Sequence, residues 1–231
     1  MKIVLDPGHG PTDNLYPDGE HYEGYQMYYL AYYLYQELKQ LGRYNLKCTR
    51  TKVTDNPTPA ERGAMAAGAD LFLSIHSNAA ANIMVDRVVV IPTITNTDED
   101  FRSFCQELGD TVKLCLACKG DTQIFDRSYQ DVNTGKIKDY YAVNRGAVEA
   151  GCKKALILEH SFHTNPEKAK LLSDFAVLKI IAKREAEIID RYLTPKQEPE
   201  EPEEPSDYWG HKGTDLVTWK DLWDILHDPN A

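Results

Sequence analysis

Short runs of aliphatic and β-branched residues alternate along the first 193 residues with longer amphipathic stretches. The runs predict strands at 2–5, 46–49, 70–75, 87–91 and 155–158. The amphipathic stretches predict helices at 23–41, 59–67, 98–119, 144–150 and 174–193. Because strands alternate with helices, we expect an α/β fold with a single mostly parallel (mixed) sheet of about six strands, flanked by helices on both faces.

The pattern changes at Thr194, where a short C-terminal appendage begins. Residues 194–206 (TPKQEPEEPEEPS) combine prolines with like charges, which is typical of an extended, solvated linker. Residues 207–231 contain all three tryptophans, and the apolar positions 219, 222, 223 and 226 have helical spacing. A helix this short needs a surface to dock on. We expect this segment to dock on a protein surface, either on the domain formed by residues 1–193 or between chains as a homo-oligomer, with sugar binding as the alternative.

Composition and charge exclude two classes of partner. The chain is 42% hydrophobic and 27% charged, within the range of globular proteins, and no apolar run is long enough to span a membrane. Its net charge is −10, which disfavours nucleic acid. The N-terminus lacks the apolar segment of a signal peptide, and the five cysteines have no disulfide-framework spacing. We therefore expect synthesis in the cytoplasm.

Three polar residues lie at the ends of predicted strands or at the start of a predicted helix, at positions that suit a metal ion. His9 lies in a glycine turn after the first strand, His76 ends an apolar strand, and Glu23 begins the first long helix. Ligands bind at the carboxyl ends of the strands in an open α/β sheet, so both histidines are expected at one edge. Two imidazoles and one carboxylate form a known catalytic zinc arrangement.

A further carboxylate ends the apolar strand at 155–158. Glu159 would emerge at the same sheet edge, where it could take a proton from a metal-activated water. Each residue also has a structural interpretation: a turn histidine, a strand-end histidine, a favourable helix N-terminal acid or a buried ion-pair partner. The structural interpretations become less convincing when the four residues are considered together, because all four are expected at the same edge of the sheet.

Several blocks of this sequence resemble the zinc-dependent N-acetylmuramoyl-L-alanine amidases of the Amidase_3 type, which include phage endolysins and bacterial cell-wall amidases. The resemblance spans residues 1–193 and rests chiefly on DPGHG, the helix that begins at Glu23, ERGAMAAGADLFLSIHSNA and LILEHSFHTNPE. It implies that His9, Glu23 and His76 hold one Zn²⁺ per chain and that Glu159 is the catalytic carboxylate. It also favours Glu23 over Glu20 as the ligand.

The resemblance implies hydrolysis of the amide between N-acetylmuramic acid and L-alanine in peptidoglycan. Zinc would activate a water molecule, and Glu159 would act first as base and then as acid. The alternatives are a zinc peptidase of the stem peptide and a non-catalytic wall-binding protein on an amidase scaffold. Further contacts with the stem peptide are expected from Asn78, Tyr140, Tyr141 and Arg145. His160 and His163 are candidate substrate-binding donors, but an ordinary hydrogen-bonding or core role is favoured for both.

The expected setting is the bacterial cell wall. A phage-type endolysin released from the cytoplasm fits the features described above, and a sporulation amidase or autolysin made without a signal peptide is the alternative.

Overall fold

A computed structural model of the chain describes residues 1–194. The predicted linker, except for Thr194, and the predicted C-terminal segment at 207–231 lie outside the described residues.

Six strands form one mixed sheet in the order β2-β1-β3-β8-β4-β5, as the sequence pattern predicts. The first four strands are mutually parallel, β4 runs antiparallel to β8, and β5 is parallel to β4. Their bounds are β1 Lys2–Pro7, β2 Asn45–Cys48, β3 Leu71–Asn78, β4 Val89–Pro92, β5 Gln123–Ile124 and β8 Ala155–Phe162.

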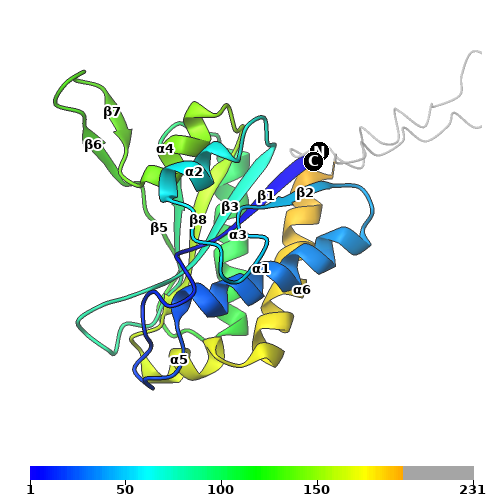
Figure 1. Cartoon of the computed structure of the whole chain (residues 1–231), viewed down its shortest axis with the longest axis vertical. Coiled ribbons are helices and arrows are strands. Elements are labelled where there is room, and N and C mark those ends of the chain that lie inside the picture. The colour runs from blue at the N-terminus through cyan, green and yellow to red at the C-terminus, as the bar shows by residue number, and fades with distance from the viewer. Residues whose placement is uncertain (195–231) are drawn as a thin grey trace, which may run out of the picture. The chain divides into compact units, whose positions relative to one another are not determined.

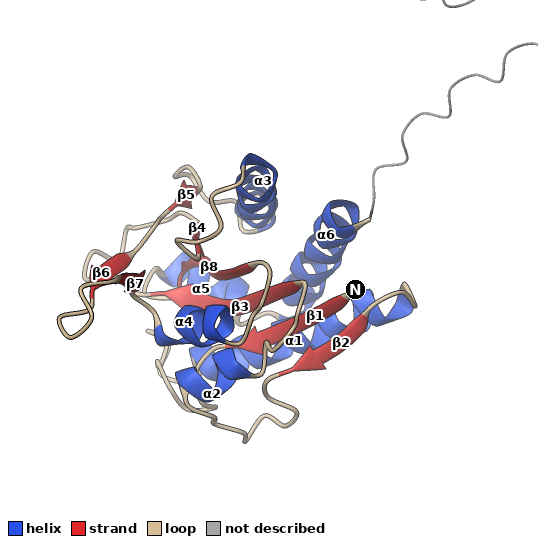
Figure 2. Cartoon of the chain, turned by 90° about the horizontal axis from the view of Figure 1, so that it is seen from above, coloured by secondary structure: helices blue, strands red, loops and turns tan. Residues whose placement is uncertain are grey.

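Helices cover both faces of this sheet (Figure 2). Apolar residues of α1, α3 and α6 pack on one face, whereas α2 and α4 pack together on the other. None of the described helices is both long and apolar enough to cross a membrane. The helices are α1 Glu23–Gln40, α2 Pro59–Ala64, α3 Glu99–Cys115, α4 Ala142–Glu149, α5 Pro166–Leu172 and α6 Phe175–Leu193.

Strand alternation divides the residues of β3 and β8 between the two faces. Leu73 and Ile75 belong to the core beneath α1 and α6, while Phe72 belongs to the core beneath α2 and α4. Because successive side chains point to opposite faces, His76 lies on the α2 and α4 face. Glu159 is its direct neighbour across the strand pair and lies on the same face.

The pairing of β3 with β8 becomes irregular just beyond this point. His76 pairs with Glu159, but the next pair is Asn78 with Phe162, so β8 contains one extra residue. Ser161 takes up that residue with a φ of 60°, a left-handed conformation that is uncommon outside glycine. The bulge therefore lies immediately after the predicted catalytic carboxylate.

Three short elements were not expected from the sequence: α5, β5 and a two-stranded hairpin. The hairpin consists of β6 (Ser128–Gln130) and β7 (Ile137–Asp139), and it projects beyond α4 at the upper left of Figure 1. Its strands have three residues each and are largely exposed, so they carry too little alternation to be recognised. The predicted helix at 98–119 ends earlier, at Cys115.

The carboxylate of Asp6 joins the end of β1 to three other parts of the fold. It accepts hydrogen bonds from the hydroxyls of Thr49 and Ser74 and from Arg62 Nη1, 3.1 Å away. Asp6 is fully buried and Arg62 is 4% exposed. Removal of one partner from such a pair leaves an uncompensated buried charge, which is far more costly than loss of a surface ion pair.

We therefore predict that Asp6→Ala lowers the free energy of unfolding of the full chain by roughly 3–5 kcal/mol. Urea denaturation followed by circular dichroism measures this change. Asp121→Ala, which removes an exposed partner of Lys113, is the control and should leave the unfolding midpoint unchanged. If the two variants lose similar stability, the Asp6 contacts do not have this role.

Candidate metal centre

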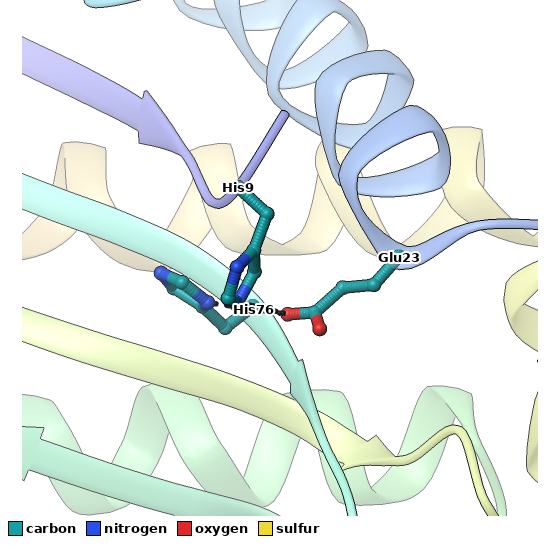
Figure 3. A group of neighbouring side chains, drawn as sticks. All are labelled: His9, Glu23 and His76. Atoms are coloured by element: carbon teal, nitrogen blue, oxygen red, sulfur yellow. Dashed lines mark hydrogen bonds and ion pairs between the residues drawn. The ribbon is translucent and has the colours of Figure 1, made fainter. Parts of the chain in front are cut away.

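His9, Glu23 and His76 converge at the carboxyl edge of the sheet (Figure 3). One ligand atom from each lies within 4.8 Å of the other two. Glu23 Oε1 lies between the histidines, 3.4 Å from His9 Nε2 and 3.1 Å from His76 Nδ1. The three side chains come from the turn after β1, the start of α1 and the end of β3, so the fold itself brings them together.

The turn that carries His9 is tightly packed against its neighbours. His9 itself has a φ of 60°, an uncommon conformation for a residue with a side chain. A Cβ atom on Gly8 would lie 2.3 Å from the ring of His76, and one on Gly24 would lie 1.6 Å from the carbonyl oxygen of Gly10. Glycine at these two positions therefore lets the turn approach both β3 and α1.

Two hydrogen bonds orient the carboxylate of Glu23. Asn14 Nδ2 donates to Oε2 at 2.6 Å, and the backbone N–H of Ser77 donates to Oε1 at 3.0 Å. Burial raises the pKa of Glu23, but His76, His9 and the Ser77 N–H outweigh it and hold the pKa at about 2. The side chain is therefore ionised at neutral pH, as a metal ligand must be.

A chain of hydrogen bonds orients His76 from the other side. Ser74 donates its hydroxyl proton to Asp6 at 2.6 Å, so its oxygen accepts from His76 Nε2, 3.1 Å away. This leaves Nδ1 directed at Glu23. Burial lowers the pKa of His76, but the hydrogen bond to Glu23 and the charges of Glu159 and Glu23 give a net upward shift.

The donor set fits a metal ion. In the protein without a cation, the Nδ1 proton of His76 bridges to Glu23, and a metal would take that position. His9 is the more exposed of the two histidines. Burial lowers its pKa although the charge of Glu23 opposes this shift, and the lowered pKa favours the neutral imidazole. Two neutral imidazoles and one carboxylate form a group that can hold a divalent cation with an open coordination position.

Glu159 lies beside this group without a satisfied hydrogen-bond environment. Its side chain is 9% exposed, and its buried Oε2 has no hydrogen-bond partner within the described residues. Burial raises the pKa of Glu159 to about 7, although the charge of His76 opposes this shift. A carboxylate with a pKa near neutrality can both accept and return a proton at physiological pH.

His160 does not face the metal group. It is fully buried on the opposite face of β8, where Nδ1 donates to the carbonyl oxygen of His76 at 3.0 Å and Nε2 lies 2.7 Å from Glu185 Oε1. Burial lowers the pKa of His160, but the ion pair with Glu185 outweighs it and raises it overall. A side chain with no exposed surface cannot line a substrate groove, so the predicted substrate contact of His160 is not supported. His160 instead connects the end of β3 to α6 by these two contacts.

His163 borders the metal group but is also buried, at 3% exposure. Its Nδ1 donates to the carbonyl oxygen of Ser77 at 3.0 Å and lies 3.9 Å from Glu23 Oε2. Its ring stacks on Tyr16, with ring centres 5.0 Å apart. Asn78 ends β3 and accepts a hydrogen bond from the N–H of Ala79. A substrate contact by either residue stays a prediction.

The other predicted substrate contacts lie at the start of α4. Arg127 stacks 3.7 Å above the ring of Tyr140 and donates to the hydroxyl of Tyr141. Arg145 donates to the carbonyl oxygens of Asp139 and Tyr140. These side chains thus hold the base of the β6–β7 hairpin, on the same side of the sheet as Glu159. Their contact with substrate also stays a prediction.

The residues that orient the ligands were not predicted from the sequence. Asn14 lies in the irregular segment at 11–22, and Ser77 acts partly through its backbone, so neither carries a recognisable pattern. Ser74 offered a signal, because it is a polar residue two positions before His76 and therefore on the same face of an apolar strand.

Comparisons with known proteins identify the family and confirm the predicted fold. Residues 3–191 match the family model described as N-acetylmuramoyl-L-alanine amidase (Amidase_3). No curated protein matches the chain in sequence.

Three solved structures share its architecture. Cwp6 from Clostridium difficile is 21% identical with a TM-score of 0.69, and the match covers 84% of this chain but only 29% of Cwp6. The catalytic domain of CwlV, an N-acetylmuramoyl-L-alanine amidase from Bacillus (Paenibacillus) polymyxa var. colistinus, is 19% identical with a TM-score of 0.67, covering 84% of this chain and 98% of that domain. Ami1 from Mycobacterium abscessus, an N-acetylmuramyl-L-alanine amidase, is 16% identical with a TM-score of 0.67, covering 84% and 99%. At these identities the likeness establishes the fold.

We predict that the chain binds one divalent cation through His9, Glu23 and His76. With zinc as the probe, calorimetry should give a stoichiometry near one, and His76→Ala should weaken binding by roughly a hundredfold or more. Asn14→Ala should weaken it by roughly ten- to a hundredfold, because Glu23 loses one of its two orienting donors. His21→Ala is the control, because it removes a histidine that pairs with Asp18 and does not belong to the metal group. Equal binding by all variants would place the cation elsewhere.

Proposed function

The chain belongs to the Amidase_3 family of N-acetylmuramoyl-L-alanine amidases, and on that premise we propose that it hydrolyses the amide between N-acetylmuramic acid and L-alanine at the site of His9, Glu23, His76 and Glu159. The observation that carries this proposal is the convergence of a His–Glu–His group beside a buried carboxylate. That carboxylate has no competing hydrogen-bond donor at Oε2 within residues 1–194.

The cofactor that this donor set supports best is one Zn²⁺ per chain, held by His9, Glu23 and His76. When bound, zinc supplies a Lewis acid that polarises the amide carbonyl and lowers the pKa of water. The chain contributes the orientation of the ligands. Asn14 and the Ser77 N–H fix the Glu23 carboxylate, and Ser74 fixes the ring of His76 so that Nδ1 faces the site.

Glu159 is the proton carrier in this proposal. Its carboxylate accepts a proton from the attacking water and delivers it to the nitrogen of the departing alanine. The carboxylate must be ionised to begin the cycle, so kcat/KM should rise as the pH rises through the pKa of Glu159. A cation held nearby stabilises the ionised form, so this midpoint should lie below the pKa of about 7 that burial and the neighbouring charges of the chain give Glu159.

The proposed substrate is peptidoglycan, and the proposed place of action is the bacterial cell wall. Family membership supports the substrate class. The site also suits a polymeric substrate, because the metal group lies at a sheet edge and His9, the outermost ligand, is 36% exposed at its side chain. A stem amide can therefore approach without insertion of the polymer into the core.

We predict that Glu159→Gln abolishes hydrolysis while the protein stays folded and binds zinc. The amide is nearly isosteric but cannot accept the proton, so kcat should fall by at least a hundredfold. Release of stem peptide from purified peptidoglycan measures activity, and calorimetry measures zinc. Glu159→Asp is the matched control, which should keep a measurable rate and the acidic limb of the pH profile. Near wild-type activity of Glu159→Gln would remove Glu159 from this role.

A further inference from the structure

Arg87 presents a cation beside Phe162, the last residue of β8, and it has no salt-bridge partner within residues 1–194. It is half-buried, and its guanidinium lies over the ring of Phe162, with Cζ 5.6 Å from the ring centre. Its buried Nε has no hydrogen-bond partner within the part of the chain that the structure describes. No carboxylate of residues 1–194 lies within salt-bridge distance of it. A partly buried guanidinium without a counter-charge is unusual in a folded protein.

The strand register places this arginine two residues from the direct neighbour of Glu159. Val89 of β4 is the direct partner of Glu159 in β8, and Arg87 precedes Val89 by two residues. Side chains two positions apart share a face, so Arg87 lies on the side of the sheet that carries His76 and Glu159. With strands about 4.8 Å apart and a rise of about 3.4 Å per residue, the Cα atoms of Arg87 and Glu159 are roughly 8 Å apart.

Other charges near Arg87 are already engaged or exposed. Asp86 lies 3.4 Å from the buried amine of Lys168 and accepts the N–H of Lys119. Glu167, in the first turn of α5, is exposed to solvent. Asp86, Lys119 and Glu167 line a cavity of about 550 Å³ together with Arg87. The guanidinium therefore keeps its charge available to a ligand in this part of the surface.

We propose that Arg87 binds a free carboxylate of the stem peptide, on the residue that follows the alanine of the scissile amide. The proposal rests on the proposed function, because that function places the amide nitrogen next to Glu159. A peptide advances about 3.3–3.6 Å per residue, so the group one residue beyond the alanine reaches the region of Arg87. An acidic peptide is the ligand class that matches an unpaired guanidinium.

The surroundings of Arg87 suit this ligand in two further respects. The ring of Phe162 lies against the guanidinium, which stabilises the cation at this place, and a guanidinium can donate two parallel N–H bonds to a carboxylate. Ile83 and Met84, exposed by 53% and 73%, form an apolar rim on the same cavity. This rim offers a surface to the aliphatic part of a peptide, while Arg87 selects the charge.

Binding of two muramyl tetrapeptides tests the subsite without turnover. The peptides differ only in whether the α-carboxyl group of the second residue is free or amidated, and the protein is full-length, zinc-loaded Glu159→Gln. By calorimetry, the free carboxylate should bind about tenfold more tightly than the amide. Addition of Arg87→Met should abolish that preference. Addition of Lys119→Met, which removes a cation from the same cavity but not from Phe162, should retain it.

Three outcomes would overturn the subsite: equal binding of the two peptides, a preference that survives Arg87→Met, or no binding of either peptide. Thermal unfolding of each variant confirms that the protein is folded. Hydrolysis of peptidoglycan by the unmodified chain is measured in parallel. Hydrolysis without a charge preference would contradict the subsite alone, whereas a preference without hydrolysis would contradict the proposed function alone.

Discussion

The buried carboxylate of Asp6 is the constraint on which the rest of the site depends. It binds Thr49, Arg62 and Ser74, and Ser74 in turn accepts from the ring of His76. This one carboxylate thus joins β1, β3 and α2 and also sets which nitrogen of His76, a proposed metal ligand, faces Glu23. Loss of Asp6 would affect folding and metal affinity through the same atoms, so stability and function are not separable at this residue.

The metal centre also depends on backbone conformations that cost free energy. His9 and Ser161 both have positive φ values, one in the turn after β1 and the other in the bulge of β8. The bulge begins directly after Glu159, and His160 crosses to the opposite face, where it pairs with Glu185 and binds the carbonyl oxygen of His76. The buried His160–Glu185 pair therefore stabilises the irregular part of the β3–β8 pairing. Because this pairing is held in place, His76 and Glu159 stay on one face of the sheet.

The sequence carried enough information to predict the sheet and the four central residues. His9, His76 and Glu159 each follow a strand, and parallel strands bring their carboxyl ends to one edge, so their proximity follows from topology alone. The orientation of His160 was also available, because strict alternation along β8 places it opposite Glu159. The contribution of Asn14 could not be predicted from the sequence, because the conformation of the segment at 11–22 depends on its packing against β3 and α1. The β6–β7 hairpin was missed for a different reason, since its strands are too short to show periodicity.

In the proposed amidase site, the fold orients the ligands, and a bound metal ion would polarise the substrate carbonyl. The most direct test of this account is the identity of the bond that is cleaved. Purified peptidoglycan is digested with the zinc-loaded chain, and the soluble products are examined by mass spectrometry and N-terminal analysis. The account predicts intact stem peptides that begin with L-alanine and glycan strands that keep their full length. Peptides that begin at an internal residue, or fragments that carry a new reducing sugar, would contradict it.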